Sequence, residues 1–133
     1  MKLTSKTRYA MRAMVFLAEC GESAPQPLSR IAQCGMPVNY LEQLLGTLRK
    51  HGLVRTVRGN QGGYLLARSA GDITLLDIIT AVEGPIKKSL CYTNTGVCSK
   101  QENCGVNKAW EKVTSGIEQV INRVSLSDMV TGS

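Results

Sequence analysis

Between residues 28 and 68, two helical patterns separated by a glycine are followed by two short β-type runs. The first helical pattern, LSRIAQC, ends at Gly35, and the second, VNYLEQLLGTLRKHG, repeats leucine at helical spacing. The next stretch, LVRTVRGNQGGYLLAR, has two apolar runs around GNQGG, which is typical of a β-hairpin. A helix-turn-helix followed by a hairpin predicts a winged helix, so the expected fold class is mainly α with a small β-hairpin wing.

Further helices are predicted on both sides of this unit. From Ser5 to Cys20 the pattern is helical, with Thr4 or Ser5 as a cap and Gly21 as a stop. Its expected buried face is Tyr9, Ala13, Phe16, Leu17 and Cys20. After the predicted hairpin, another helix should run from residue 74 to 82 and stop at Gly84-Pro85. Its inward-facing residues should be Ile73, Leu76, Ile79, Ala81 and Val82.

A long helix is predicted from Val106 onward. Its apolar residues recur at steps of four and three, which is the spacing of a coiled coil. This stripe could lie on the helix's own domain, but its position beyond the core favours a partner helix from a second copy. The expected dimer interface consists of Trp110, Val113, Ile117, Val120 and Val124.

Positive charge is concentrated in the first half of the chain. Residues 1–70 hold ten Lys or Arg against three Asp or Glu, a balance of +7, whereas residues 71–133 hold six against seven, a balance of −1. An ordinary solvated surface is one explanation, and a phosphate-binding face is the other. No apolar run approaches the roughly 20 residues of a membrane span. The charged N-terminus does not resemble a signal peptide, so we expect a cytoplasmic protein.

The second helix of the helix-turn-helix would read DNA. Asn and Gln can pair with adenine, Glu can accept from cytosine, and an Arg on a narrow hairpin fits a minor groove. Glu42 could instead be an ordinary exposed residue, and Arg58 a solvated turn charge. The base-reading candidates are Asn39, Tyr40, Glu42, Gln43 and Arg58. The phosphate-contact candidates are Arg8, Arg12, Lys50 and Arg55.

Three of the five cysteines, Cys91, Cys98 and Cys104, fall in the polar stretch CYTNTGVCSKQENC. Cytoplasmic thiols stay reduced, so this cluster indicates metal or redox chemistry before a disulfide. Thiolates select iron–sulfur clusters or zinc, and three reduced cysteines without metal are the remaining alternative. Cys20 and Cys34 lie on predicted helices and are expected to be buried.

No pattern predicts an enzyme, because the chain has no Ser-His-Asp set, no paired acidic motif and no nucleotide-binding loop. A ferredoxin-like electron carrier is the other class to weigh. Such a protein would have four cysteines and no basic winged helix, and a DNA-shift assay would separate it from a regulator.

Four segments together resemble the IscR-type family of bacterial transcriptional regulators. They are LTSKTRYAMRAM, YLEQLL, VRGNQGGYLLAR and the three cysteines before a long helix. The similarity runs over almost all of the chain. It implies a winged helix with a long dimerisation helix, acting as a homodimer on palindromic DNA. In this branch it also implies a [2Fe-2S] cluster and control of cluster-assembly genes.

By this resemblance, Cys91, Cys98 and Cys104 are the cluster ligands. The family's usual fourth ligand is a histidine at the position of Asn107, and the first cysteine spacing is one residue longer than usual. His51, at the end of the predicted reading helix, is a poor substitute. A nitric-oxide-sensing branch uses an aspartate where this chain has Arg8. The fourth ligand therefore stays open, and related regulators of nitric oxide, redox or thiol state, or a zinc form, remain alternatives.

The resulting organisation is one regulator domain with four parts. Residues 1–70 form the DNA-binding winged helix, 71–90 a connecting helix, 91–104 the cluster-binding loop, and 105–133 the dimerisation helix and a C-terminal tail.

Overall fold

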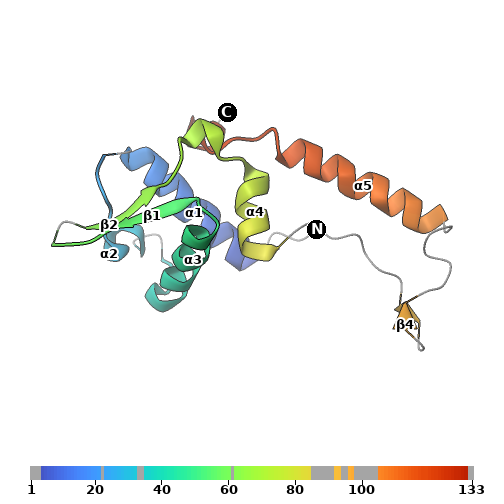
Figure 1. Cartoon of the computed structure of the whole chain (residues 1–133), viewed down its shortest axis with the longest axis horizontal. Helices are drawn as coiled ribbons and strands as arrows, with labels where there is room; N and C mark the ends of the chain where they lie inside the picture. Colours follow the sequence, from blue (N-terminus) through green and yellow to red (C-terminus); the bar gives the residue numbers. More distant parts are fainter. Residues whose placement is uncertain are drawn as a thin grey trace.

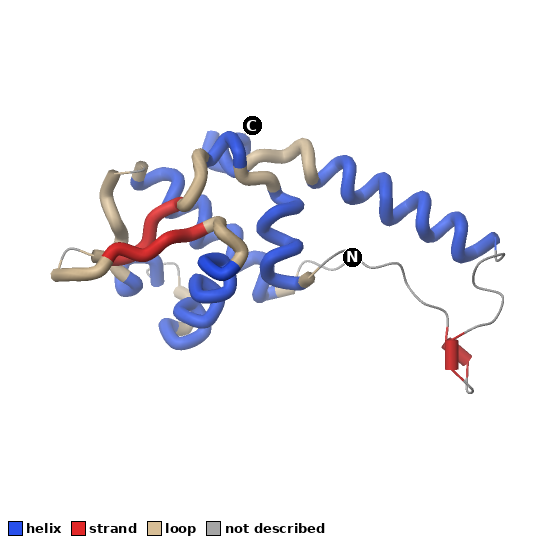
Figure 2. The backbone as a smooth tube through the Cα atoms, in the orientation of Figure 1, coloured by secondary structure: helices blue, strands red, loops and turns tan. Residues whose placement is uncertain are grey.

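The computed structural model describes residues 4–21, 23–32, 35–60, 62–84, 92–93, 96–97 and 105–131. One long helix, α5 (Gly105–Ile121), projects from a body that holds most other elements (Figures 1 and 2). Two short strands, β3 (Tyr92–Thr93) and β4 (Gly96–Val97), pair with each other away from the body. The body contains α1 (Ser5–Cys20), α2 (Leu28–Ile31), α3 (Val38–Lys50), β1 (Val54–Val57), β2 (Gly63–Leu66), the 3-10 helix η2 (Ala70–Asp72), α4 (Leu75–Glu83) and α6 (Leu126–Thr131).

The predicted winged helix is confirmed. Helices α2 and α3 are followed by an antiparallel hairpin in which Val54 of β1 lies opposite Leu66 of β2. Helix α2 covers only four residues of the predicted pattern LSRIAQC, and Pro27 at its N-cap makes no side-chain capping hydrogen bond. Pro37 is the N-cap of α3 and directly precedes its first turn.

The leucine face predicted for α3 is confirmed as the centre of the core. Leu41, Leu44, Leu45 and Leu48 are all buried. Burying a leucine side chain contributes about 1.5–3 kcal/mol, so this face alone holds α3 firmly in the body. The opposite face of α3 is thereby fixed toward solvent.

The buried face of α1 differs from the predicted one. Ala13 and Leu17 are buried as expected, but Tyr9, Phe16 and Cys20 are only half-buried. Helix α1 contacts α2, α3, α4, α6 and β2. Its buried residues still form one helical stripe, but that stripe is centred on Ala10 and Met14 and not on Tyr9 and Phe16. Its buried residues are Thr7, Ala10, Ala13, Met14 and Leu17.

The wing is tied to the segment before α2. The Gln26 N–H donates to the Tyr64 carbonyl at 3.0 Å, and the Tyr64 N–H donates to the Gln26 carbonyl at 2.8 Å. Gly63 lies beside this bridge with φ +156, and a Cβ atom there would overlap the Gln26 carbonyl group. The close approach of these two backbones requires glycine at this position.

After α5 the chain returns to the body through two backbone hydrogen bonds. The Leu75 N–H donates to the Val124 carbonyl at 2.8 Å, and the Leu126 N–H donates to the Ile73 carbonyl at 2.8 Å. Ile73 and Leu126 are fully buried. We call residues 73–75 and 124–126 together the strap, because they fix the end of α5 against the body.

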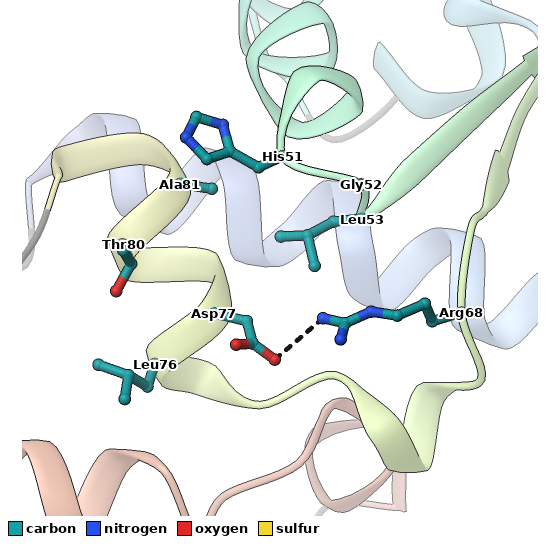
Figure 3. A pocket seen from close by; sticks show the side chains of 8 residues that line it. All are labelled: His51, Gly52, Leu53, Arg68, Leu76, Asp77, Thr80 and Ala81. Carbon is teal, nitrogen blue, oxygen red and sulfur yellow. Dashed lines mark hydrogen bonds and ion pairs between the residues drawn. The ribbon is translucent and has the colours of Figure 1, made fainter.

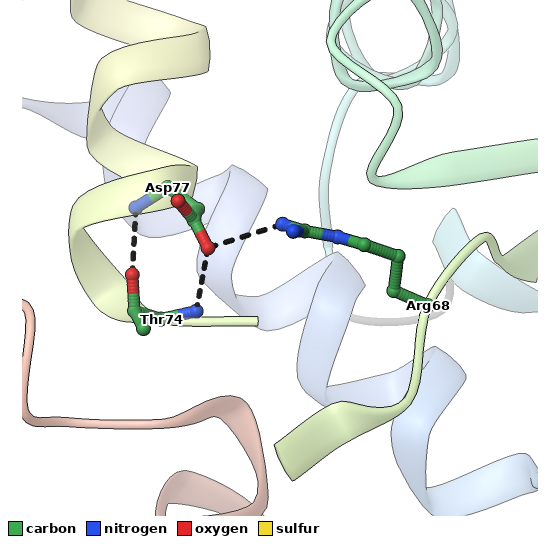
Figure 4. A network of polar contacts seen from close by, with 3 residues as sticks. All are labelled: Arg68, Thr74 and Asp77. Carbon is green, nitrogen blue, oxygen red and sulfur yellow. Dashed lines mark hydrogen bonds and ion pairs between the residues drawn. The ribbon is translucent and has the colours of Figure 1, made fainter. Parts of the chain in front are cut away.

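Each of the two segments of the strap is followed by a helix, and both helices begin with the same reciprocal cap. At α4, the Thr74 hydroxyl accepts from the Asp77 N–H, and the Asp77 carboxylate accepts from the Thr74 N–H (Figure 4). At α6, Ser125 and Asp128 make the equivalent pair at 3.2 and 3.0 Å. The backbone hydrogen bond from Ser125 keeps the pKa of Asp128 below its usual value, with help from the Ser125 hydroxyl.

Two expectations about the second half of the chain need correction. Helix α5 ends at Ile121, so Val124 lies in the strap and not on the long helix. Leu76 is half-exposed on α4, while Ile78, which was not expected inside, is buried. Helix α4 packs against both α1 and α3, so its buried face is turned toward Ile78 and away from Leu76.

No helix in the described part of the chain combines the length and apolarity needed to cross a membrane.

Gly63→Ala should lower the free energy of unfolding by about 1–3 kcal/mol, because the added methyl group forces the wing away from Gln26. Thermal or urea unfolding measures this. Gly46→Ala on α3 is the control, since no atom lies within 4 Å of its added Cβ, and it should be neutral or stabilise by up to about 1 kcal/mol. Equal stability of the wild type and Gly63→Ala would contradict the wing anchor.

Candidate nucleic-acid interface

One face of α3 is polar and exposed. Asn39, Glu42 and Gln43 are all exposed, on the side of the helix away from its buried leucines. At about 100° per residue, these three side chains fall within two successive turns. Amide and carboxylate groups are types that can bond the edges of DNA bases, so a base-reading role for this face stays a prediction.

Tyr40 has a different environment from its neighbours. It is half-buried, and its ring meets that of Tyr9 edge-to-face, with centroids 5.8 Å apart and an interplanar angle of 78°. Such a pair contributes about 0.5–1.5 kcal/mol beyond the area it buries. The ring therefore sets the position of the first turn of α3 on α1, and a contact from Tyr40 to a base stays a prediction.

The wing carries two exposed cations beside α3. Arg55 lies on β1, and Arg58 directly follows this strand. The wing projects from the body next to α3 (Figure 1). A helix and an adjacent basic hairpin can contact neighbouring grooves of one duplex.

The other three predicted phosphate contacts lie on α1 and at the end of α3. Lys50 is exposed at the last turn of α3, far along the helix from Asn39. Arg8 and Arg12 are exposed on α1, where they line a groove of about 370 Å³ together with Met129 of α6. None of the five predicted phosphate or wing cations forms an ion pair with any residue that the structure describes. Their charge is therefore available to an external anion.

An exposed apolar stripe follows α5. The exposed fractions are 74% for Val106, 47% for Trp110, 49% for Val113 and 62% for Val120, while Ile117 is half-buried. A protein surface rarely leaves such a row of large apolar side chains in water unless another surface covers it. The stripe coincides with the predicted dimer interface, except that Val124 lies in the strap.

The predicted metal ligands Cys91, Cys98 and Cys104 lie outside the described residues. Within the described ranges, no group of three or more His, Cys, Asp or Glu side chains could hold a metal ion. Asn107, at the position of the family's histidine, is 6% exposed on the first turn of α5. The three thiols are suitable ligands for an iron–sulfur cluster but supply only three of the four that it needs, and the neutral amide of Asn107 is a weak donor for the fourth position.

The other two cysteines, Cys20 and Cys34, lie in the first half of the chain. Cys20 is a free thiol, half-buried at the end of α1, where full burial was expected. Cys34 lies outside the described residues.

The first turn of α1 is held by Glu83, a residue that the sequence analysis missed. One Glu83 carboxylate oxygen, Oε1, accepts hydrogen bonds from the hydroxyls of Thr4 and Thr7, the latter at 2.8 Å. The hydrogen bond from Thr4 lowers the pKa of Glu83 most, followed by that from Thr7. Glu83 is the last residue of α4, so it joins the end of the connecting helix to the start of α1.

Comparison with known proteins agrees with this geometry. The model of the Rrf2 family, described as "Iron-dependent Transcriptional regulator", matches residues 3–132. The chain is 39% identical over 131 residues to the HTH-type transcriptional regulator IscR of Cronobacter sakazakii, covering 98% of this chain and 80% of that protein. For IscR of Klebsiella pneumoniae subsp. pneumoniae the identity is 38% over 131 residues, with the same coverage of 98% and 80%.

Two solved structures are similar over nearly their whole length. T. potens IscR has a TM-score of 0.78 and 38% identity, covering 99% of this chain and 88% of that one. CymR (YrzC), described as the global cysteine regulator of B. subtilis, has a TM-score of 0.80 and 30% identity, covering 100% of this chain and 98% of that one.

Glu83→Gln should destabilise the protein at neutral pH, because a neutral amide accepts the two threonine hydrogen bonds more weakly. A carboxyl whose pKa is depressed by folding stabilises the protein above its unfolded pKa, and this contribution is lost as the pH falls. The stability difference between the wild type and Glu83→Gln should therefore shrink as the pH falls below the ordinary glutamate pKa of about 4.3 and through the lowered pKa of folded Glu83. Urea unfolding across pH 3–7 measures it.

Glu19→Gln removes an exposed carboxylate from α1 and serves as the control. It should follow the wild type at every pH. A Glu83→Gln difference that is constant with pH would show that the carboxylate charge does not contribute to this contact.

Proposed function

The chain belongs to the Rrf2 family of DNA-binding transcription regulators, and on this premise we propose that it acts as a homodimer that responds to an iron–sulfur cluster. Its relatives are transcription regulators and not enzymes. We further propose that it binds a palindromic operator in the cytoplasm and controls genes for cluster assembly. The observation that carries the DNA-reading role is the exposed polar face of α3 beside a basic wing.

In the proposed complex, the exposed face of α3 enters the major groove. Asn39, Glu42 and Gln43 reach base edges there, and Arg58 on the wing approaches the adjacent minor groove. The exposed cations contact phosphates and position the protein without reading sequence. The buried leucines and the Tyr9–Tyr40 contact keep α3 from rotating, so the same three side chains are always presented.

In the proposed sensor, Cys91, Cys98 and Cys104 would hold a [2Fe-2S] cluster, and the fourth ligand would not be cysteine. A cluster with one non-thiolate ligand supplies a labile, oxygen- and redox-sensitive centre. The chain's own contribution is placement: the thiols lie in sequence between α4, whose last residue holds the start of α1, and α5, which carries the proposed dimer stripe. Zinc, or reduced thiols without metal, are outcomes of the test below.

A DNA-binding assay on randomised sequences should distinguish side chains that recognise bases from side chains that contact only phosphates. Glu42→Ala and Gln43→Ala should change the preferred bases by roughly 1–3 kcal/mol at one or two positions. Arg55→Ala should weaken binding to all sequences alike and reduce the salt dependence of the affinity. A uniform loss of affinity in all three variants would contradict the proposed orientation of α3.

The dimer proposal predicts that Val113→Asp produces monomers, because it places a charge in an apolar interface. Val113 is exposed on the single chain, so the fold should survive the change. Gln119→Asp adds the same charge to another face of α5 and should leave the dimer intact. Sedimentation velocity measures both variants, and a dimeric Val113→Asp protein would remove α5 from the interface.

The cluster proposal predicts that anaerobically purified protein contains iron and sulfide in equal amounts and absorbs visible light. Cys98→Ala should lose the iron, the sulfide and the absorption while keeping its far-ultraviolet circular dichroism. Cys20→Ala is the matched control and should keep the cluster, because this thiol lies on α1. Stoichiometric zinc without sulfide would refute the cluster, and so would an unchanged spectrum in Cys98→Ala.

A further inference from the structure

Val38, the first residue of α3, is a large apolar side chain that the body leaves uncovered. It lies in one helical stripe with Leu41, Leu45 and Leu48, at steps of three, four and three residues. These three leucines are fully buried, whereas Val38 is 49% exposed. Among the described residues, Val38 is the only exposed large apolar side chain outside α5. The apolar stripe of α3 therefore continues one turn beyond the core.

The two ends of α3 have different surroundings. After its last turn, His51 and Leu53 line a pocket of about 450 Å³ together with Ala81 of α4 (Figure 3). Leu53 is 2% exposed, so the chain leaves α3 directly into the body. At the other end, Val38 and Asn39 are both exposed. This first turn is the part with which a helix-turn-helix protein contacts base edges.

Val38 lies next to the residues that are proposed to read bases. Asn39 follows it directly, and Glu42 lies four residues later. Side chains four residues apart on a helix have Cβ atoms about 5–6 Å from each other. Consecutive bases of one strand are about 3.4 Å apart along the duplex. A helix that holds Glu42 against one base edge therefore brings Val38 within about two base pairs of that edge.

The chemistry of valine limits what this side chain can recognise. It has no hydrogen-bond donor or acceptor, so it cannot pair with the polar groups of a base edge. A polar base group placed against it would lose water without gaining a hydrogen bond. In the major groove, thymine is the base that presents a methyl group, and apolar side chains contact this group.

We propose that Val38 packs against the C5 methyl group of a thymine and is a further specificity-determining residue of α3. This inference rests on the proposed function, because it requires the first turn of α3 to lie in a major groove. It adds a base type that the polar residues do not select, since Asn39 and Gln43 suit adenine and Glu42 suits cytosine. The contact also covers the one turn of the apolar stripe that the body leaves in water.

The test uses an operator selected from random DNA with the wild-type protein. Each thymine of one half-site is replaced in turn by deoxyuridine, which pairs with adenine in the same way but lacks the C5 methyl group. One of these replacements should weaken wild-type binding by about fourfold, the effect of leaving one methyl group in water. The sensitive thymine should lie within about two base pairs of the position whose preference changes in Glu42→Ala.

Val38→Ser should bind thymine and deoxyuridine at this position equally, because it has no apolar group to pack against the methyl group. A merely structural role for Val38 would weaken binding to both operators alike and keep their fourfold difference. Val38→Ile retains an apolar side chain and should retain the preference for thymine. Since Val38 is half in water, the melting temperatures of both variants should stay close to that of the wild type.

The proposal is overturned if no deoxyuridine replacement weakens wild-type binding, or if the sensitive thymine lies far from the position read by Glu42. An undiminished loss in Val38→Ser would also overturn it. The deoxyuridine series needs only the wild-type protein, so it can refute the proposal even if a variant fails to fold. If Glu42→Ala and Gln43→Ala change the preferred bases while deoxyuridine has no effect, this inference fails and the proposed function stands. If no operator is selected at all, both fail.

Discussion

The two backbone hydrogen bonds of the strap determine how the halves of this molecule are related. They act together with the direct contact between α4 and α5 and with the packing of α6 on α1. With Leu75 bonded to Val124 and Leu126 bonded to Ile73, the end of α5 is fixed beside the start of α4. Since α6 then packs against α1, the chain after α5 becomes part of the body that orients α3. A surface carried by α5 therefore has a defined position relative to the DNA-reading face.

The polar contacts around this scaffold connect elements that are far apart in sequence. Glu83 joins the last turn of α4 to the first turn of α1, and the caps at Thr74 and Ser125 begin the two helices that leave the strap. In contrast, the cations of the proposed DNA-binding surface have no ion-pair partners among the described residues. The carboxylates of Asp77, Glu83 and Asp128 are used inside the scaffold, while the predicted DNA-contacting cations are left for an external anion. This division is physically sensible in a protein that binds a polyanion.

The sequence predicted the parts of the fold that depend on one-sided burial. The leucine repeat of α3 and the two runs around GNQGG each face one environment, so their periodicity reports their structure directly. Helix α1 was harder because it also carries apolar residues beside its buried stripe, such as Tyr9 and Phe16, which are only half-buried. Helix α6 was missed, although Ser125-x-x-Asp128 is a recognisable start signal. The strap could not have been found in this way, because it consists of backbone hydrogen bonds between segments distant in sequence.

The account requires that two rigidly held reading faces act together on one DNA molecule. The most direct measurement is selection of bound sequences from random DNA, followed by affinity measurements on operators whose half-site separation is varied. The account predicts a palindrome whose affinity falls sharply when about five base pairs, roughly half a helical turn, are inserted between the half-sites. Affinity that is independent of this separation, or selection of a single half-site, would contradict it.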